Sequence, residues 1–154
     1  MDAIEQKLAA LGLQLPEPVK PAFEYVPVAI HGEWAYVSGQ LPRLNAHTVV
    51  TGKLGVDLDV ERGREAARLC TLHALANLRS TLGTLERIAA VVKLTGFVAS
   101  APGFTQQPQV VDGASRLLAD VFGERGRHAR SAVGVAELPR GAAVEIEMIV
   151  ALRG

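Results

Sequence analysis

Apolar residues recur at helical spacing in three segments of the chain. The longest is Val60–Leu82, where Asp59 is placed as an N-cap and Gly83 as a stop signal, and it predicts a long amphipathic helix. A second helix is predicted at about Pro108–Phe122, and a short one over residues 2–10. The apolar stripe of the long helix consists of Ala67, Cys70, Ala74, Leu75, Leu78 and Leu82.

Between these helices, apolar segments bounded by Gly and Pro predict five β-strands. The turn His31–Glu33 joins the first two strands and predicts a hairpin, whereas Leu138–Gly141 joins the last two. The predicted strands are Phe23–Ile30, Trp34–Ser38, Ile88–Ser100, Ser131–Ala136 and Ala143–Val150.

The order of elements after the first helix is β-β-α-β-α-β-β, which predicts a two-layer α+β domain with a mixed sheet and two helices on one face. One domain is expected over residues 1–154, with residues 1–22 forming a helix and a proline-rich connector. The other face of the sheet needs a cover, and its Val, Ala, Ile and Met residues suggest that a second subunit supplies it.

Composition narrows the possible partners and the compartment. The 154 residues are 49% hydrophobic and 21% charged, and 16 Lys and Arg balance 16 Asp and Glu. Nucleic acid is therefore an unlikely partner by charge, and the basic cluster Arg125–Arg130 is more typical of a solvated loop. Cys70 is the single cysteine, so no intrachain disulfide forms, and a reducing, cytoplasmic location is expected. No apolar run is long enough to span a membrane.

Several familiar catalytic motifs are missing. No Gly-rich phosphate-binding loop occurs, and Gly123–Gly126 follows a helix instead of opening one. The four histidines have no partner three or four residues away, so no metal site is predicted. Ser38 lacks the glycines of a nucleophile elbow, which argues against a serine hydrolase.

Charged residues interrupt the last two predicted strands. Arg130 precedes an apolar strand, and Glu145 and Glu147 alternate with apolar residues, so both carboxylates face away from the apolar set. One interpretation is that Arg130 is a charge held in solvent at the sheet edge and that Glu145 and Glu147 lie on a solvated face of the strand. The alternative is a cleft in which Arg130 and Glu145 meet a ligand.

Three segments in this order resemble the YjgF/RidA family, also called the endoribonuclease L-PSP or reactive-intermediate deaminase family. They are "YVSGQLP" at 36–42, "ARSAVGVAELP" at 129–139 and "VEIEMIV" at 144–150. The resemblance extends from about Phe23 to the C-terminus. The added N-terminal helix and the run "FGERGRHARSAVGV" are similar to a longer branch of that family.

The resemblance implies a chorismate-mutase-like fold, a homotrimer and ligand clefts between subunits. Characterised members hydrolyse imines and enamines such as 2-aminoacrylate to a 2-keto acid and ammonia, with no metal or organic cofactor. This chain is therefore expected to be such a hydrolase. A non-catalytic protein that binds small carboxylates in the same cleft is the alternative, and a role in RNA cleavage or translation inhibition is a weaker one.

The resemblance also implies roles for individual residues. Arg130 would hold the substrate carboxylate through two parallel N–H···O bonds, and Glu145 would orient or deprotonate the attacking water. Tyr25 would pack against the substrate or hydrogen-bond to it. Ser38 and Gly39 match a strand end whose backbone groups contact the ligand.

Two positions depart from the family pattern. Ala132 stands where deaminases commonly have a cysteine that contributes mainly backbone contacts, so a substrate-binding role is still expected there. Asp112 corresponds to an asparagine at the start of the second helix. A carboxylate at this position would repel an acidic substrate.

Overall fold

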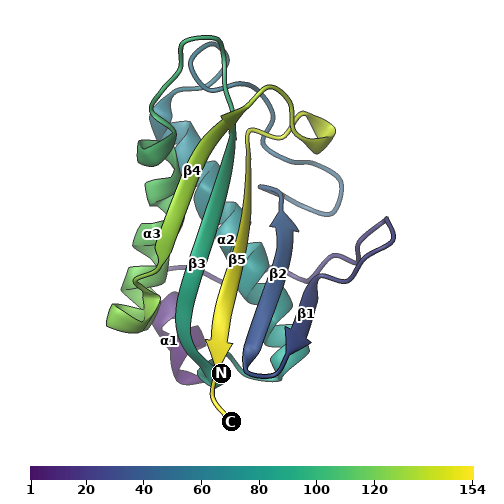
Figure 1. Cartoon of the computed structure of the whole chain (residues 1–154), viewed down its shortest axis with the longest axis vertical. Coiled ribbons are helices and arrows are strands. Elements are labelled where there is room, and N and C mark those ends of the chain that lie inside the picture. The colour runs from purple at the N-terminus through teal and green to yellow at the C-terminus, as the bar shows by residue number, and fades with distance from the viewer.

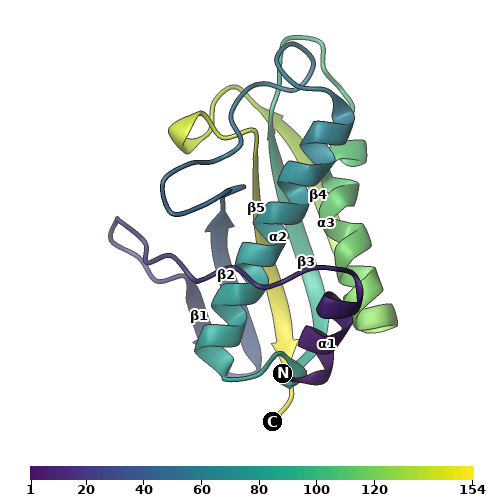
Figure 2. The ribbon, with the colours of Figure 1, turned by 180° about the vertical axis from the view of Figure 1, so that it is seen from behind.

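The computed structural model describes all 154 residues, and it places a five-stranded mixed sheet against a layer of helices (Figures 1 and 2). Figure 2 shows α2 lying across the sheet on the face that carries the helices, and the opposite face has no helix on it. The predicted α+β class is confirmed. The elements are α1 (Ala3–Ala10), β1 (Val28–His31), β2 (Trp34–Gln40), α2 (Val60–Leu82), β3 (Ile88–Ala99), α3 (Gln107–Phe122), β4 (Ala129–Val135) and β5 (Val144–Leu152).

The strands lie in the order β1-β2-β5-β3-β4. All neighbouring pairs are antiparallel except β3 and β4, which are parallel. The last two strands of the chain are therefore not neighbours, because β3 lies between them. The segment Leu138–Gly141, with a short 3₁₀ turn at Pro139–Gly141, carries the chain past β3. This leaves β1 and β4 as the two edges of the sheet.

The helix ends form where the sequence predicts them. The Asp59 carboxylate accepts a hydrogen bond from the Arg62 amide at 2.8 Å, which satisfies one of the free donors of the first turn of α2. Gly83 ends α2 with φ of 85°, a conformation that glycine adopts without steric cost. The apolar face of α2 packs on the sheet and on α3 and forms one continuous core.

The N-terminal helix is fixed to the rest of the protein at both ends of its first turn. Asp2 and Glu5 form a capping box, and the second Asp2 oxygen accepts hydrogen bonds from the Thr84 hydroxyl at 2.7 Å and the Leu85 amide at 2.6 Å. Ile4 and Leu8 are buried in the main core. The helix α1 therefore closes one end of the helix layer, beside α3.

The predicted first strand is too long. Only Val28–His31 forms β1, and residues 21–27, called the arm below, are irregular and project beside the sheet edge (Figure 1). Pro21 and Pro27 bound the arm and have no amide hydrogen to donate to a strand partner. Phe23 is 80% exposed. Apolar character alone predicts a strand here, but the prolines prevent regular pairing.

Candidate functional site

Strand alternation places the predicted site residues on two faces of the sheet. Arg130 on β4 is in register with Leu94 on β3, and Leu94 is in register with Met148 on β5. Leu94 and Met148 are buried toward the helices, so Arg130 also points to the helix side. Glu145 lies three residues before Met148 on the same strand, so its side chain points to the open face. The prediction that Glu145 faces away from the apolar set is confirmed.

Within one chain, Arg130 and Glu145 do not form one site. They are separated by two strand spacings across the sheet and three residues along it, which places their Cα atoms roughly 14 Å apart. Their side chains also leave the sheet in opposite directions. The structure therefore presents two separate groups of predicted site residues.

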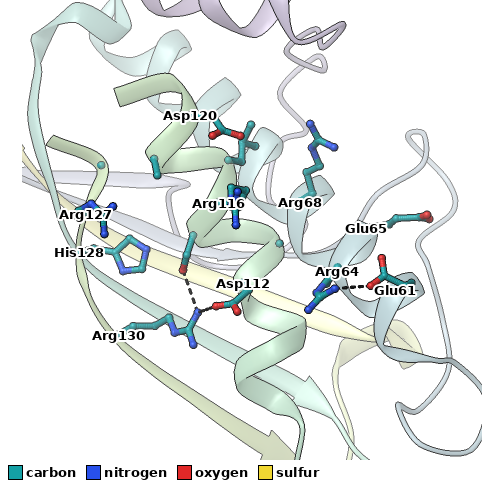
Figure 3. A pocket seen from close by; sticks show the side chains of 15 residues that line it. Glu61, Arg64, Glu65, Arg68, Asp112, Arg116, Asp120, Arg127, His128 and Arg130 are labelled. Carbon is teal, nitrogen blue, oxygen red and sulfur yellow. Dashed lines mark hydrogen bonds and ion pairs between the residues drawn. The ribbon is translucent and has the colours of Figure 1, made fainter. Parts of the chain in front are cut away.

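The first group surrounds Arg130, which α3 holds in place. Its Nη1 donates to Asp112 Oδ1 at 2.7 Å and to Ser115 Oγ at 3.1 Å, and its Nη2 donates to the carbonyl oxygen of Pro108 at 3.3 Å. Figure 3 shows both side-chain contacts. The Arg130 side chain is only 21% exposed. It is thus a positioned group and not a mobile surface charge.

Arg130 nevertheless keeps hydrogen-bonding capacity. A guanidinium has five N–H donors, and the three contacts use both hydrogens of Nη1 and one of Nη2. The Nε–H and one Nη2 hydrogen remain. Adjacent N–H groups of this kind can donate to the two oxygens of one carboxylate.

Arg130 opens onto a polar groove of about 1150 Å³ between α2, α3 and β4. Five arginines and four carboxylates line this groove, so the charges nearly cancel. Burial lowers the pKa of His128, and a nearby Arg130 charge acts in the same direction, so His128 is neutral at pH 7. Figure 3 shows Arg64, Arg68, Arg116, Asp120, Arg127 and His128 around the groove.

The second group lies on the open face, around Glu145. A Cβ atom on Gly39 would come within 2.2 Å of Glu145 Oε2, so the missing side chain of Gly39 is what makes room for the carboxylate. No protein group donates a hydrogen bond to this half-buried carboxylate. Burial and, less strongly, the neighbouring charge of Glu147 raise the pKa of Glu145.

Ser38 and Tyr25 lie at the same end of β2 as Gly39. The Ser38 hydroxyl donates to the Val26 carbonyl oxygen at 2.7 Å, and its amide donates to the Pro27 carbonyl oxygen at 2.9 Å. Ser38 therefore anchors the arm, and its hydroxyl hydrogen is already used. Tyr25 is an exposed residue of that arm.

Ala132 belongs with Arg130. It lies two residues further along β4, in register with Gly96, and its side chain packs against the main core. The sequence alone does not predict that Asp112 pairs with Arg130, nor that Ser115 accepts a hydrogen bond from it. The spacing of Asp112 and Ser115, one turn apart on a predicted helix, was the available signal. It could not identify the partner, because helix–strand packing is not local in sequence.

Replacing Gly39 by alanine should move the Glu145 carboxylate while leaving the fold intact. The new Cβ conflicts only with the flexible end of the Glu145 side chain, which can rotate away. Melting temperature should therefore change little, whereas any reaction that needs Glu145 should slow by about tenfold or more. Parallel melting and rate measurements on G39A would check this. Unchanged turnover would show that the position of this carboxylate is unimportant.

Comparisons with known proteins identify the class. A model of the YjgF/chorismate mutase-like family of candidate endoribonucleases matches residues 5–149, and the chain belongs to this family. Protein TCP17 of Trypanosoma cruzi is 47% identical over 97% of this chain and 94% of its own length. A 2-iminobutanoate/2-iminopropanoate deaminase of Dermatophagoides farinae is 30% identical over 89% of this chain and 90% of its own.

The solved structures fall into two groups by how closely their folds match this chain. A protein of unknown function from Agrobacterium tumefaciens is 48% identical with a TM-score of 0.92, covering 99% of this chain and 94% of that one. A candidate endoribonuclease from Shewanella oneidensis is 35% identical with a TM-score of 0.94, covering 98% and 100%. A candidate endoribonuclease from Thermotoga maritima reaches 0.61 at 28% identity, covering 90% and 93%. The first two match nearly the whole chain, including α1.

No group of three or more His, Cys, Asp or Glu side chains is arranged to hold a metal ion. No helix of the protein combines the length and the apolar character needed to cross a bilayer.

Proposed function

We propose that this protein is an imine/enamine deaminase that hydrolyses 2-aminoacrylate-like intermediates to 2-keto acids and ammonia. The observation that carries the proposal is Glu145, a half-buried carboxylate with a raised pKa and no hydrogen-bond donor from the protein. Because the pKa is raised in the folded protein, ionising this carboxyl group at neutral pH costs stability. A function in accepting a proton from water accounts for that cost.

The reaction requires few catalytic groups. The enamine tautomerises to the iminium carboxylate, and water adds to its electrophilic carbon while Glu145 accepts a proton from that water. Glu145 returns this proton to the amino nitrogen, and the C–N bond breaks as the carbonyl forms and the hydroxyl proton passes to the released ammonia. The balanced result is CH₃–C(=NH₂⁺)–COO⁻ + H₂O → CH₃–CO–COO⁻ + NH₄⁺. Arg130 holds the carboxylate with its remaining N–H donors. No metal or organic cofactor takes part in these steps.

The two groups of site residues meet in this proposal across a subunit boundary. Because Arg130 and Glu145 lie on opposite faces of one sheet, the complete site takes Arg130 and Ala132 from one subunit and Glu145, Gly39 and Tyr25 from the next. A homotrimer is the proposed assembly. The exposed apolar residues of the strands, Trp34, Tyr36 and Val133 among them, suit a subunit contact.

Further support comes from the D. farinae relative, whose name gives the same activity. A cytoplasmic location is part of the proposal, because the single cysteine, Cys70, is buried and forms no disulfide. The near balance of charges in the Arg130 groove argues against RNA as a partner.

Ammonia release from enzymatically generated 2-aminoacrylate tests the proposal. The wild-type protein should accelerate release, and Arg130→Gln should lower kcat/KM by about a hundredfold, because a charged bidentate contact to the substrate is lost. Arg68→Gln is the matched control, because Arg68 lines the same groove and makes no ion pair in the structure. If wild type and Arg130→Gln were equally inactive on a broad panel of imines, the proposal would fail.

The pairing of Arg130 with Asp112 favours a second candidate, a non-catalytic protein that binds small carboxylates. An arginine already held by a carboxylate is better suited to moderate, reversible binding than to a tight clamp. In that case small carboxylates would raise the melting temperature in proportion to their concentration without ammonia release. The same assay therefore separates the two candidates.

A further inference from the structure

We propose that Asp112 determines ligand specificity at the Arg130 site, selecting zwitterions that carry a carboxylate and a protonated nitrogen on the adjacent carbon over simple carboxylate anions. The ligand class follows from the geometry around Arg130. The statement that the physiological zwitterion is an iminium carboxylate rests on the proposed function.

The first argument is the position of the Asp112 charge. Its Oδ1 lies 2.7 Å from Arg130 Nη1, and its side chain is 58% exposed beside the groove. Nothing in the protein donates to its other oxygen, Oδ2. Asp112 therefore offers one free acceptor with a negative charge, directly next to the donors that Arg130 keeps for a ligand.

The second argument is electrostatic. A carboxylate bound to the Nε and Nη2 of Arg130 would lie about 6 Å from the Asp112 carboxylate, a distance at which like charges repel appreciably in a partly buried site. A protonated nitrogen on the neighbouring carbon reverses the sign of that interaction, because it can approach Oδ2 as a charged donor. Asp112 thus weakens the binding of an anion at Arg130 and strengthens the binding of a zwitterion at the same position.

The other groups near Arg130 do not replace Asp112 in this role. Ser115 is neutral, and His128 is neutral at pH 7 because burial lowers its pKa. Arg127 is paired with Glu124 at 3.2 Å. Asp112 is the only carboxylate that contacts the Arg130 guanidinium. Within one subunit, Asp112 is therefore the carboxylate that acts directly on a ligand bound to Arg130.

This arrangement also discriminates between substrate and product. The iminium carboxylate is a zwitterion, whereas the keto acid that remains after ammonium departs is a monoanion. Asp112 would attract the first and repel the second. Substrate binding and product release would then both be favoured by the same carboxylate.

Alanine and propionate are the probes, because they share a carbon skeleton and differ by the α-ammonium group. Binding of L-alanine, D-alanine and propionate to the full-length protein is measured by calorimetry at fixed ionic strength. Asp112→Asn keeps an oxygen for Arg130 Nη1 but removes the charge. Asp120→Asn is the matched control, because Asp120 lies on the same helix and groove without contacting Arg130.

For the wild type, at least one alanine enantiomer should bind about tenfold more tightly than propionate. Asp112→Asn should strengthen propionate binding and weaken alanine binding, changing the ratio of the two dissociation constants by about tenfold or more. Asp120→Asn should leave the ratio unchanged, and Arg130→Gln should weaken both ligands.

Three results would overturn the inference. The first is that the wild type binds neither alanine nor propionate, and the second is that the ratio of their dissociation constants in Asp112→Asn stays within about twofold of the wild-type ratio. The third is that Arg130→Gln binds both probes as tightly as the wild type. A ratio that shifts as expected in a protein that releases no ammonia from imines would support the specificity role of Asp112 and reject the deaminase proposal. Failure of the Asp112 specificity role can thereby be distinguished from failure of the deaminase proposal.

Discussion

Replacing Glu145 by glutamine is expected to lower kcat by about 10²–10⁴-fold, the usual contribution of a general base. Glutamine has nearly the same shape, so it fits above Gly39, but it cannot accept the proton of the attacking water. Ligand binding at Arg130 should persist, because the ligand carboxylate is held by Arg130, whose position is fixed by Asp112 and Ser115 and not by Glu145. Steady-state ammonia release together with calorimetric binding of alanine would separate these two effects.

The pH profile gives an independent check on the role of Glu145. Burial and, less strongly, the charge of Glu147 raise its pKa, so the carboxylate protonates at a higher pH than an ordinary glutamate. Since the base is active only when deprotonated, kcat/KM should fall as pH decreases through this raised pKa. In Glu147→Gln the like charge is absent, and the acid limb should move to lower pH with an unchanged plateau.

The same pKa shift predicts the stability of the glutamine variant. A carboxyl group whose pKa is higher in the folded protein than in the unfolded chain destabilises the fold above that pKa, where it must ionise while half buried. Glu145→Gln should therefore be at least as stable as wild type at pH 7. Retained turnover with an unchanged acid limb in this variant would contradict the role assigned to Glu145.

Gly113→Ala is expected to destabilise the protein, although alanine is the better helix former. A Cβ at Gly113 would lie 2.2 Å from the carbonyl oxygen of Arg64, which is backbone of α2 and cannot rotate away. Because the clash is with backbone, separating the two helices should cost about 3 kcal/mol, the upper end of the usual range for overpacking. The helix propensity gained, about 1 kcal/mol, offsets only part of this cost. A net loss of about 2 kcal/mol in the free energy of unfolding is expected.

Urea unfolding measures this loss, with Asp120→Ala as the control because its exposed side chain lies on the same helix. The control should stay within about 0.5 kcal/mol of wild type. Gly113 adjoins Asp112, so a displaced α3 should also weaken ligand binding at Arg130. A Gly113→Ala protein of wild-type stability would show that α2 and α3 can separate at negligible cost.

Local chemistry explains which parts of the fold were predictable. Asp59 and Gly83 mark the ends of α2 because capping depends only on neighbouring backbone groups. The alternation on β5 identified the face of Glu145 for the same reason. The length of β1 was overestimated, because Pro27 blocks regular pairing in the segment Phe23–Val26, whose composition resembles a strand.

The site was less predictable, because it depends on strand order and helix packing. The position of β3 between β4 and β5 sets the separation of Arg130 from Glu145, and no local pattern specifies this order. The Asp112 partner of Arg130 depends on where α3 lies against β4. The family resemblance supplied both proposed site residues, Arg130 and Glu145, but not their placement on opposite faces.

The edges of the sheet determine what kind of symmetry can complete the proposed site. The Arg130 strand β4 lies at one edge, while the arm and Gly39 lie toward the other, because β1 pairs with β2 only as far as Val37. A two-fold pair uses one surface patch on both subunits, so it would complete the site only if Arg130 and Glu145 belonged to the same patch, and they lie on opposite faces of the sheet. Head-to-tail contacts join unlike edges, and only a closed ring leaves no chain with an unmatched half. An open, incomplete ring would always lose one reaction centre.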